Sequence, residues 1–125
     1  MGDKSQFLRG TLEGCILKII NDEEVYGYEI AEKLKKYGLN EVSEGTIYPL
    51  LLRLEKNGFV DSIKKESAFG PKRKYYSLSS LGKKELRNFY DNWEELRDSI
   101  DRIFEDYGRK EIWARQSEKE KKISN

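Results

Sequence analysis

A helix with a clear start and a clear stop is encoded by residues 43–58, which read SEGTIYPLLLRLEKNG. Ser43 is suited to accept a hydrogen bond as the N-cap residue, and the Asn57-Gly58 pair is a typical helix end. Between them the apolar residues recur at i, i+3, i+4 and i+7, the period of one helix face, namely Ile47, Leu50, Leu51 and Leu54. The spacing therefore predicts an amphipathic helix whose apolar face packs on a core.

Two further helices are predicted before it. Apolar residues recur every three or four positions over 7–20, and again from Tyr26-Gly27-Tyr28 as far as Gly38. The polar stretch 21–24 separates these two patterns, and Gly38 is a natural C-terminal stop. The sequence thus predicts three consecutive helices that share one small core.

The period of the pattern changes after the third helix. Residues 59–65 and 74–78 are rich in β-branched and aromatic side chains, and they flank a Gly70-Pro71 pair that marks a turn. We therefore expect a two-stranded hairpin with a loose tip. Three helices followed by a hairpin is the order of a winged helix-turn-helix, in which the hairpin is the wing. The predicted fold class is mainly α with a small β-hairpin, and we place this domain at residues 5–78.

A longer helix is predicted over residues 79–113, with Ser79 as its cap. Its apolar residues follow one another in alternating steps of three and four, a heptad pattern typical of helices that pair: Leu86, Phe89, Trp93, Leu96, Ile100, Ile103 and Tyr107. We expect these residues to form a homodimer interface, and packing on the chain's own domain is the alternative. Residues 114–125 mix Lys and Glu and are expected to be a flexible charged tail.

Composition excludes several classes of function. The chain has no His and one Cys, so triads that need an imidazole and Cys/His zinc clusters are excluded. It also lacks a Gly-rich phosphate loop, so we expect no enzyme, no metal and no cofactor. No stretch approaches the roughly 20 apolar residues of a membrane span, and no signal-peptide apolar region is present. We expect a cytoplasmic protein without membrane contact, in which Cys15 is a small buried hydrophobe rather than a reactive thiol.

The charge of the chain is unevenly distributed. The 24 basic and 23 acidic residues leave a net charge of +1, which alone indicates no particular partner. Residues 64–74 nevertheless hold five basic side chains and one acidic, a net +4, whereas residues 82–113 hold seven basic and nine acidic. Positive charge is therefore concentrated where a wing would touch DNA phosphates. Charged residues also keep a hairpin edge soluble, and that alternative stays open.

Polar side chains of the third helix are candidates for reading DNA, because a helix N-terminus in the major groove brings N–H groups and hydroxyls to phosphates and base edges. Together with the wing they make the predicted DNA-binding set: Ser43, Thr46, Tyr48, Arg53, Lys64, Lys72, Arg73 and Lys74. A dimer would present two such helices to double-stranded DNA, which predicts an inverted-repeat operator. The alternative function is a winged helix that binds protein and not DNA.

Trp93 suggests a second kind of site. A broad indole at a helix seam, with Phe89 before it and Leu96 after it, is able to line a flat pocket for a small aromatic effector. The predicted ligand-binding residues are accordingly Phe89, Trp93 and Leu96. The alternative is that Trp93 is an ordinary core residue.

Three segments closely resemble the PadR family of transcriptional regulators. They are YGYEI at 26–30, GTIYPLL with the following RLE and Gly58 at 45–58, and RKYYSL at 73–78. The resemblance covers roughly residues 8–107. It implies a winged-helix DNA-binding domain and a long C-terminal helix that makes a homodimer, usually in a repressor of a transporter or detoxification gene. The DNA-contacting residues of the family map onto Thr46 and Tyr48 and onto Lys72, Arg73 and Lys74.

The short C-terminal region resembles the small subfamily, which includes a lactococcal multidrug-responsive regulator. In that regulator paired indoles of the last helix sandwich flat aromatic drugs, and the run 89–93, FYDNW, is similar. The residues after Trp93 are more acidic here, with Glu94, Glu95 and Asp98. This acidity suits a cationic aromatic ligand.

Overall fold

The structure, a computed structural model, describes residues 8–67, 70–107 and 118. The chain divides into two units, residues 1–90 and 91–125. The tail predicted at 114–125 and the last residues of the helix predicted to end at 113 lie outside the described residues, apart from residue 118.

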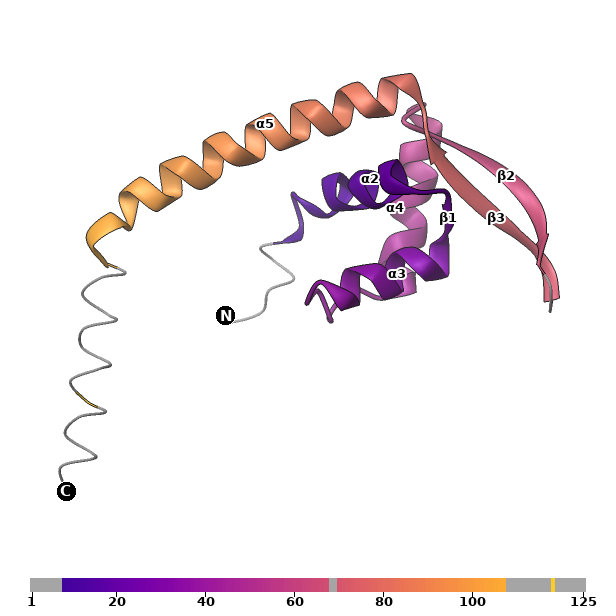
Figure 1. The fold of residues 1–125 in the computed structure, drawn as a ribbon, viewed down its shortest axis with the longest axis horizontal. Helices are drawn as coiled ribbons and strands as arrows, with labels where there is room; N and C mark the ends of the chain where they lie inside the picture. Colours follow the sequence, from indigo (N-terminus) through magenta and orange to yellow (C-terminus); the bar gives the residue numbers. More distant parts are fainter. Residues whose placement is uncertain (1–7, 68–69, 108–117, 119–125) are drawn as a thin grey trace. The chain divides into compact units, whose positions relative to one another are not determined.

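Three helices build the core of the first unit: α2 (Leu12–Asp22), α3 (Gly27–Lys36) and α4 (Glu44–Lys56) (Figure 1). Their apolar faces meet as the periodicity predicted, and the residues with no exposed surface include Ile16, Ile30, Ile47 and Leu51. Cys15 is half-buried against this core, and burial raises the pKa of its thiol, as expected for a small hydrophobe.

Helix α2 begins later and ends later than the predicted 7–20. The start differs because the backbone N–H of Thr11 bonds to the carbonyl of Leu8 in a turn, and the helix proper starts at Leu12. The helix extends two residues further, to Asp22, where Lys18 and Asp22 form an i,i+4 ion pair, Nζ to carboxylate oxygen at 2.6 Å, which stabilises the last turn.

A three-stranded antiparallel sheet, in the order β1-β3-β2, flanks the helices. Strand β1 (Val25–Tyr26) pairs Val25 with Tyr76, whereas the sequence predicted two strands and placed Tyr26 at the start of a helix. Two residues are too few to show the alternation of a strand, which is why the pattern missed β1. The mainly α winged helix-turn-helix class is confirmed, with this third strand added.

The wing is the hairpin of β2 (Val60–Ser67) and β3 (Gly70–Leu78). Both strands are longer than predicted, and Gly70-Pro71 belongs to β3 and not to a separate turn. Pairing continues to Ser67 and Gly70 after a register shift between Lys65 and Ser67. This irregularity lies next to Pro71, which has no backbone N–H to donate to a ladder.

Helix α5 (Ser80–Ile103) follows the wing. Ser79 caps it as predicted, since the backbone N–H of Gly82 donates to Ser79 Oγ at 2.9 Å. The α-helix ends at Ile103, and within the described residues a turn at position 104 separates it from one further helical segment, 105–107. None of the described helices combines the length and the apolar run that a membrane crossing needs.

The first two heptad positions of α5 are in contact with the chain's own domain. Leu86 is partly buried against the core, and the ring of Phe89 lies over Gly14 of α2, which has no side chain to obstruct it. In the second unit Trp93 is 38% exposed and Leu96 53% exposed, and the later heptad residues are also exposed: Ile100, Ile103 and Tyr107. Of the seven heptad residues, the first two therefore contact the chain's own domain, and the other five are exposed in the single chain.

Candidate nucleic-acid interface

A groove of about 660 Å³ lies between the start of α3, helix α4 and strand β3. Tyr48 of α4 and three successive wing cations all line this groove. The groove therefore brings together residues that the sequence analysis predicted, from separate segments, to bind DNA. The lining residues are Tyr26, Gly27, Tyr28, Glu44, Tyr48, Leu52, Lys72, Arg73, Lys74 and Tyr76. The groove thus combines flat aromatic surface with a cationic edge.

Two of its tyrosines, Tyr26 and Tyr28, were not nominated from the sequence. Their rings stack with centroids 6.4 Å apart. The carboxylate of Glu32 raises the pKa of Tyr28, both through its negative charge and through a hydrogen bond with the Tyr28 side chain. The Tyr-Gly-Tyr triplet at the start of the predicted helix is the sequence feature that could have indicated these two residues. Tyr48 lies against Gly27, where an added Cβ would be 2.7 Å from Tyr48 Cε1, so any larger residue at position 27 would require the exposed Tyr48 ring to shift.

The start of α4 presents two exposed hydroxyls. Ser43 is the N-cap residue as predicted, but its side chain makes no capping bond and lies 3.3 Å from the hydroxyl of Thr46. Both hydroxyls therefore stand at the positive end of the helix dipole, where unpaired N–H groups also point outward. This arrangement suits contact with phosphate oxygens and base edges.

Arg53 has a partner elsewhere in the domain. Its Nε donates to Glu13 Oε1 of α2 at 2.6 Å, and its Nη2 pairs with the same oxygen. Arg53 is not among the groove residues. The structure therefore groups Ser43, Thr46 and Tyr48 at one end of α4 and ties Arg53 to α2.

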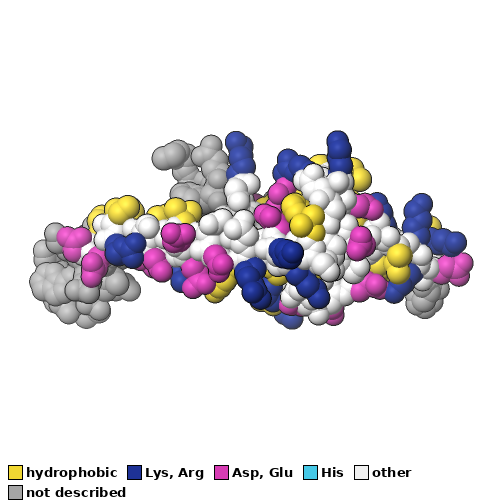
Figure 2. Space-filling model, turned by 90° about the horizontal axis from the view of Figure 1, so that it is seen from above, with side chains coloured by type: hydrophobic (Ala, Val, Ile, Leu, Met, Phe, Trp, Pro, Cys, Tyr) yellow, Lys and Arg dark blue, Asp and Glu magenta, His cyan; other side chains and the backbone are white. Residues whose placement is uncertain are grey.

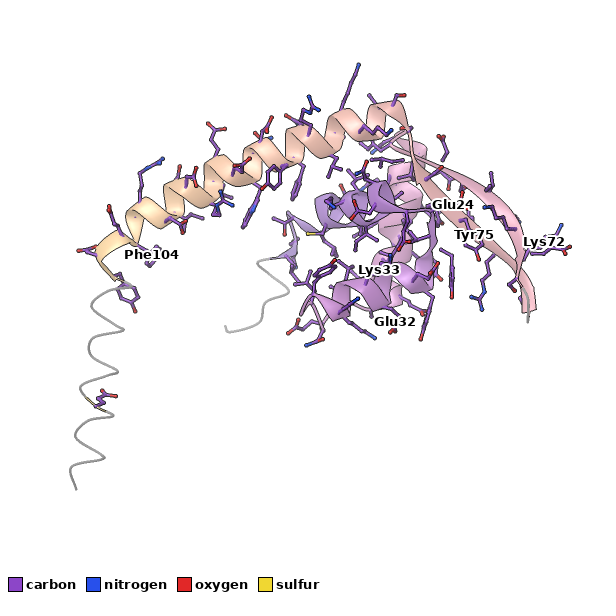
Figure 3. All side chains as sticks on the ribbon, in the orientation of Figure 1. Glu24, Glu32, Lys33, Lys72, Tyr75 and Phe104 are labelled. Carbon is purple, nitrogen blue, oxygen red and sulfur yellow. The ribbon has the colours of Figure 1, made fainter. Side chains whose placement is uncertain are left out.

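Lys and Arg side chains gather at the right-hand end of the view in Figure 2, over the wing. Three of the five have partners in the same chain: Lys65 pairs with Glu24, Lys74 with Glu55, and the Arg73 guanidinium lies 4.4 Å from the ring centre of Tyr26. Lys64 and Lys72 are exposed and make no ion pair with the residues that the structure describes. Figure 3 shows Lys72 at the outer part of the hairpin.

Glu55 connects α4 to both strands of the wing. Its Oε1 accepts a hydrogen bond from Lys74 Nζ at 2.6 Å, and its Oε2 accepts one from Ser62 Oγ at 2.5 Å. The bond from Lys74 lowers the pKa of Glu55 and raises the pKa of Lys74, so both groups are charged at neutral pH. Sequence reasoning missed Glu55, because nothing in the pattern links residues 19 positions apart.

No group of His, Cys, Asp and Glu side chains within the described ranges is arranged to hold a metal ion. The groove instead has the features of a surface for a polyanion, with three cations of the hairpin beside the start of a helix that carries exposed hydroxyls. These features, on three helices and a wing, define a winged-helix protein of the transcription-regulator class.

Comparison with known proteins identifies the family. Residues 16–88 match the transcriptional regulator PadR-like family. A PadR-like transcriptional regulator from Bacillus cereus is 47% identical, with 79% of this chain and 96% of that chain covered and a TM-score of 0.73. A transcriptional regulator of Mycobacterium tuberculosis is 33% identical over 91 residues, which cover 73% of this chain and 83% of that protein.

Bacillus subtilis PadR, solved in complex with operator DNA, is 28% identical, with 66% of this chain and 48% of that chain covered and a TM-score of 0.59. The chain belongs to the PadR-like family of transcriptional regulators, which confirms the resemblance seen in its motifs. Membership in a family of regulators also agrees with the expectation that the protein is not an enzyme.

Proposed function

We propose that the protein is a cytoplasmic, homodimeric regulator that binds an inverted repeat in double-stranded DNA. The observation that carries this proposal is the groove, which places the exposed start of α4 beside the cationic wing. The similar fold of Bacillus subtilis PadR, solved with operator DNA, supports it.

In this proposal the start of α4 enters the major groove. Ser43, Thr46 and Tyr48 contact base edges and nearby phosphates, because their polar groups are exposed at the helix end. Lys64 and Lys72 neutralise phosphates, since they are the wing cations that make neither an ion pair nor a cation–π contact with the described residues. Two such surfaces about 34 Å apart in a dimer would read successive turns of the duplex.

Reversing both free wing cations, in Lys64→Glu/Lys72→Glu, is expected to weaken binding at least 10-fold on every duplex sequence. Each lost phosphate contact removes about 0.9 from the slope of log affinity against log salt concentration, so the slope should become shallower by about 1.8. The measurement is a fluorescence-anisotropy titration of labelled duplex at several salt concentrations.

Lys35→Glu/Lys36→Glu is the matched control for this titration, because it reverses two exposed cations at the end of α3, outside the groove. It should keep most of the wild-type slope. If the double reversal leaves the slope of the wild type, the wing does not contact phosphate. If the wild type itself shows no steep salt dependence, the protein-binding alternative replaces DNA binding.

We further propose that the protein represses a transporter or detoxification gene and is released by a flat aromatic effector at α5. Trp93 is partly exposed, and the next heptad residue, Leu96, is exposed as well. Glu94 and Asp98 pair with Arg97 at 3.8 and 3.5 Å, and together with Glu95 they leave this stretch of α5 with a net negative charge, which favours a cationic ligand. Phe89 already lies over Gly14, so the proposal rests mainly on Trp93 and Leu96.

A planar cationic dye such as ethidium is expected to quench the fluorescence of Trp93. The measurement is best made in a Trp113→Phe background, so that Trp93 is the sole tryptophan and is excited selectively, with the two-Trp chain as reference. Dye binding, followed by the dye's own emission, should fall at least 10-fold in Trp93→Ala, because stacking on the indole is lost. Equal dye affinity in both proteins would contradict an effector site at Trp93.

A further inference from the structure

We propose that Glu55 is a positioning residue of the DNA interface, which holds Lys74 as an internal strut between α4 and the wing. Lys74 then serves to orient the wing and does not neutralise a phosphate. This inference rests on the proposed DNA binding, and it reassigns one of the cations that the family resemblance places on DNA.

The geometry gives one carboxylate a contact with each wing strand. Glu55 lies in the last turn of α4, and its two oxygens accept hydrogen bonds from Lys74 of β3 and Ser62 of β2. The side chains of Glu55 and Lys74 are 32% and 36% exposed, so the pair is partly shielded from water. The angle between the wing and the reading helix α4 is therefore fixed from two points.

The register of the wing explains why such a strut is needed. Lys64 lies directly opposite Lys74, and Lys65 directly opposite Arg73. Like charges at directly opposed positions of an antiparallel pair destabilise it. In each pair, a carboxylate from outside the hairpin reduces the repulsion between the two cations. Glu55 forms an ion pair with Lys74 of the first pair, and Glu24 forms one with Lys65 of the second.

The same arrangement separates the roles of the two opposed lysines. Lys74 forms an ion pair with Glu55, and its Nζ lies 5.6 Å from the ring centre of Tyr76. Lys64, in contrast, is exposed and forms no ion pair with the described residues. A wing held in one orientation can follow the shape of a particular site. A wing with an additional free ammonium group would bind any duplex more tightly.

Glu55→Gln tests this inference. The amide keeps the size of the side chain but loses its charge, so Lys74 becomes free to contact phosphate. We expect affinity for a short random-sequence duplex to rise about 3- to 10-fold, and the salt slope to steepen by about 0.9, the value for one added contact. Preference for a duplex selected by the wild type from a random pool should fall.

Two further variants make the test specific. Glu66→Gln removes one negative charge from an exposed wing position outside the Glu55 network, so it controls for net charge and should not steepen the slope by a full contact. The double variant Glu55→Gln/Lys74→Met should return the slope to that of the wild type, because the freed ammonium group is gone.

Lys74→Met alone distinguishes a strut from a phosphate contact even where Glu55→Gln folds poorly. A wild-type salt slope with a reduced preference for the selected duplex supports the strut. A slope shallower by about 0.9 overturns it, because Lys74 would then be a direct phosphate contact. Absence of salt-dependent binding by the wild type would instead overturn the proposed function, so the two failures are distinguishable in the same titration series.

Discussion

Leu96→Glu is expected to convert the protein to a monomer and to weaken operator binding at least 100-fold. In the proposed dimer, a carboxylate at the centre of the apolar α5 seam would be buried without a partner, which is costly for association. Losing the dimer also removes the second half-site from reach, and linking two binding modules typically raises avidity by about 10²- to 10⁴-fold. Light scattering gives the mass in solution, and anisotropy with an inverted-repeat duplex gives the affinity.

Asn88→Glu is the matched control for this variant. It adds the same charge to an exposed position of α5 that is not part of the heptad pattern. The control should keep the mass and operator affinity of the wild type. A Leu96→Glu protein with the mass of a dimer would show that α5 does not pair through this face, and the proposed spacing of two reading helices would lose its basis.

Gly82→Ala is expected to destabilise the domain by about 3 kcal/mol, the upper end of the usual cost of overpacking. An added Cβ would lie 2.9 Å from Leu78 Cδ1 and closer still to the carbonyl oxygen of Phe59, far inside van der Waals contact. That oxygen cannot easily move, because it accepts hydrogen bonds from the backbone N–H and the hydroxyl of Ser79 at 3.1 and 3.0 Å. Urea unfolding followed by circular dichroism measures the loss.

Gly45→Ala makes the opposite prediction and serves as the control for Gly82→Ala. Gly45 is exposed within α4, and the nearest atom to an added Cβ is Ser43 Oγ at 3.7 Å. Alanine there should be neutral or should stabilise the domain by up to about 1 kcal/mol, because it favours the helix. Equal stability of the two variants would mean that the contact between Gly82 and Phe59 is not tight in solution.

The helices and the wing were predictable because each has a period long enough to recognise. The spacing of Ile47, Leu51 and Leu54 was sufficient for α4, and the change of period after Gly58 located the hairpin. Strand β1 was not predictable, because Val25 and Tyr26 owe their conformation to pairing with β3, about 50 residues further along the chain.

The candidate site was only partly predictable for the same reason. Net charge located the wing cations, but it did not show that Lys65 and Lys74 have partners outside the hairpin or that Arg53 pairs with Glu13. The heptad pattern also does not distinguish a partner helix from the chain's own domain, since both present an apolar surface. Leu86 and Phe89 therefore fit the repeat while contacting their own domain.

The opposed cations of the wing limit how this hairpin can be exchanged between relatives. If residues 60–78 were grafted into another regulator, they would carry both pairs of directly opposed cations with them. The carboxylates that reduce the repulsion in these pairs, Glu24 and Glu55, would be left behind. Tyr26, on which Arg73 stacks, would also be missing. A functional chimera therefore has to transplant the acceptor groups of the scaffold together with the hairpin, because the wing is not an autonomous cassette.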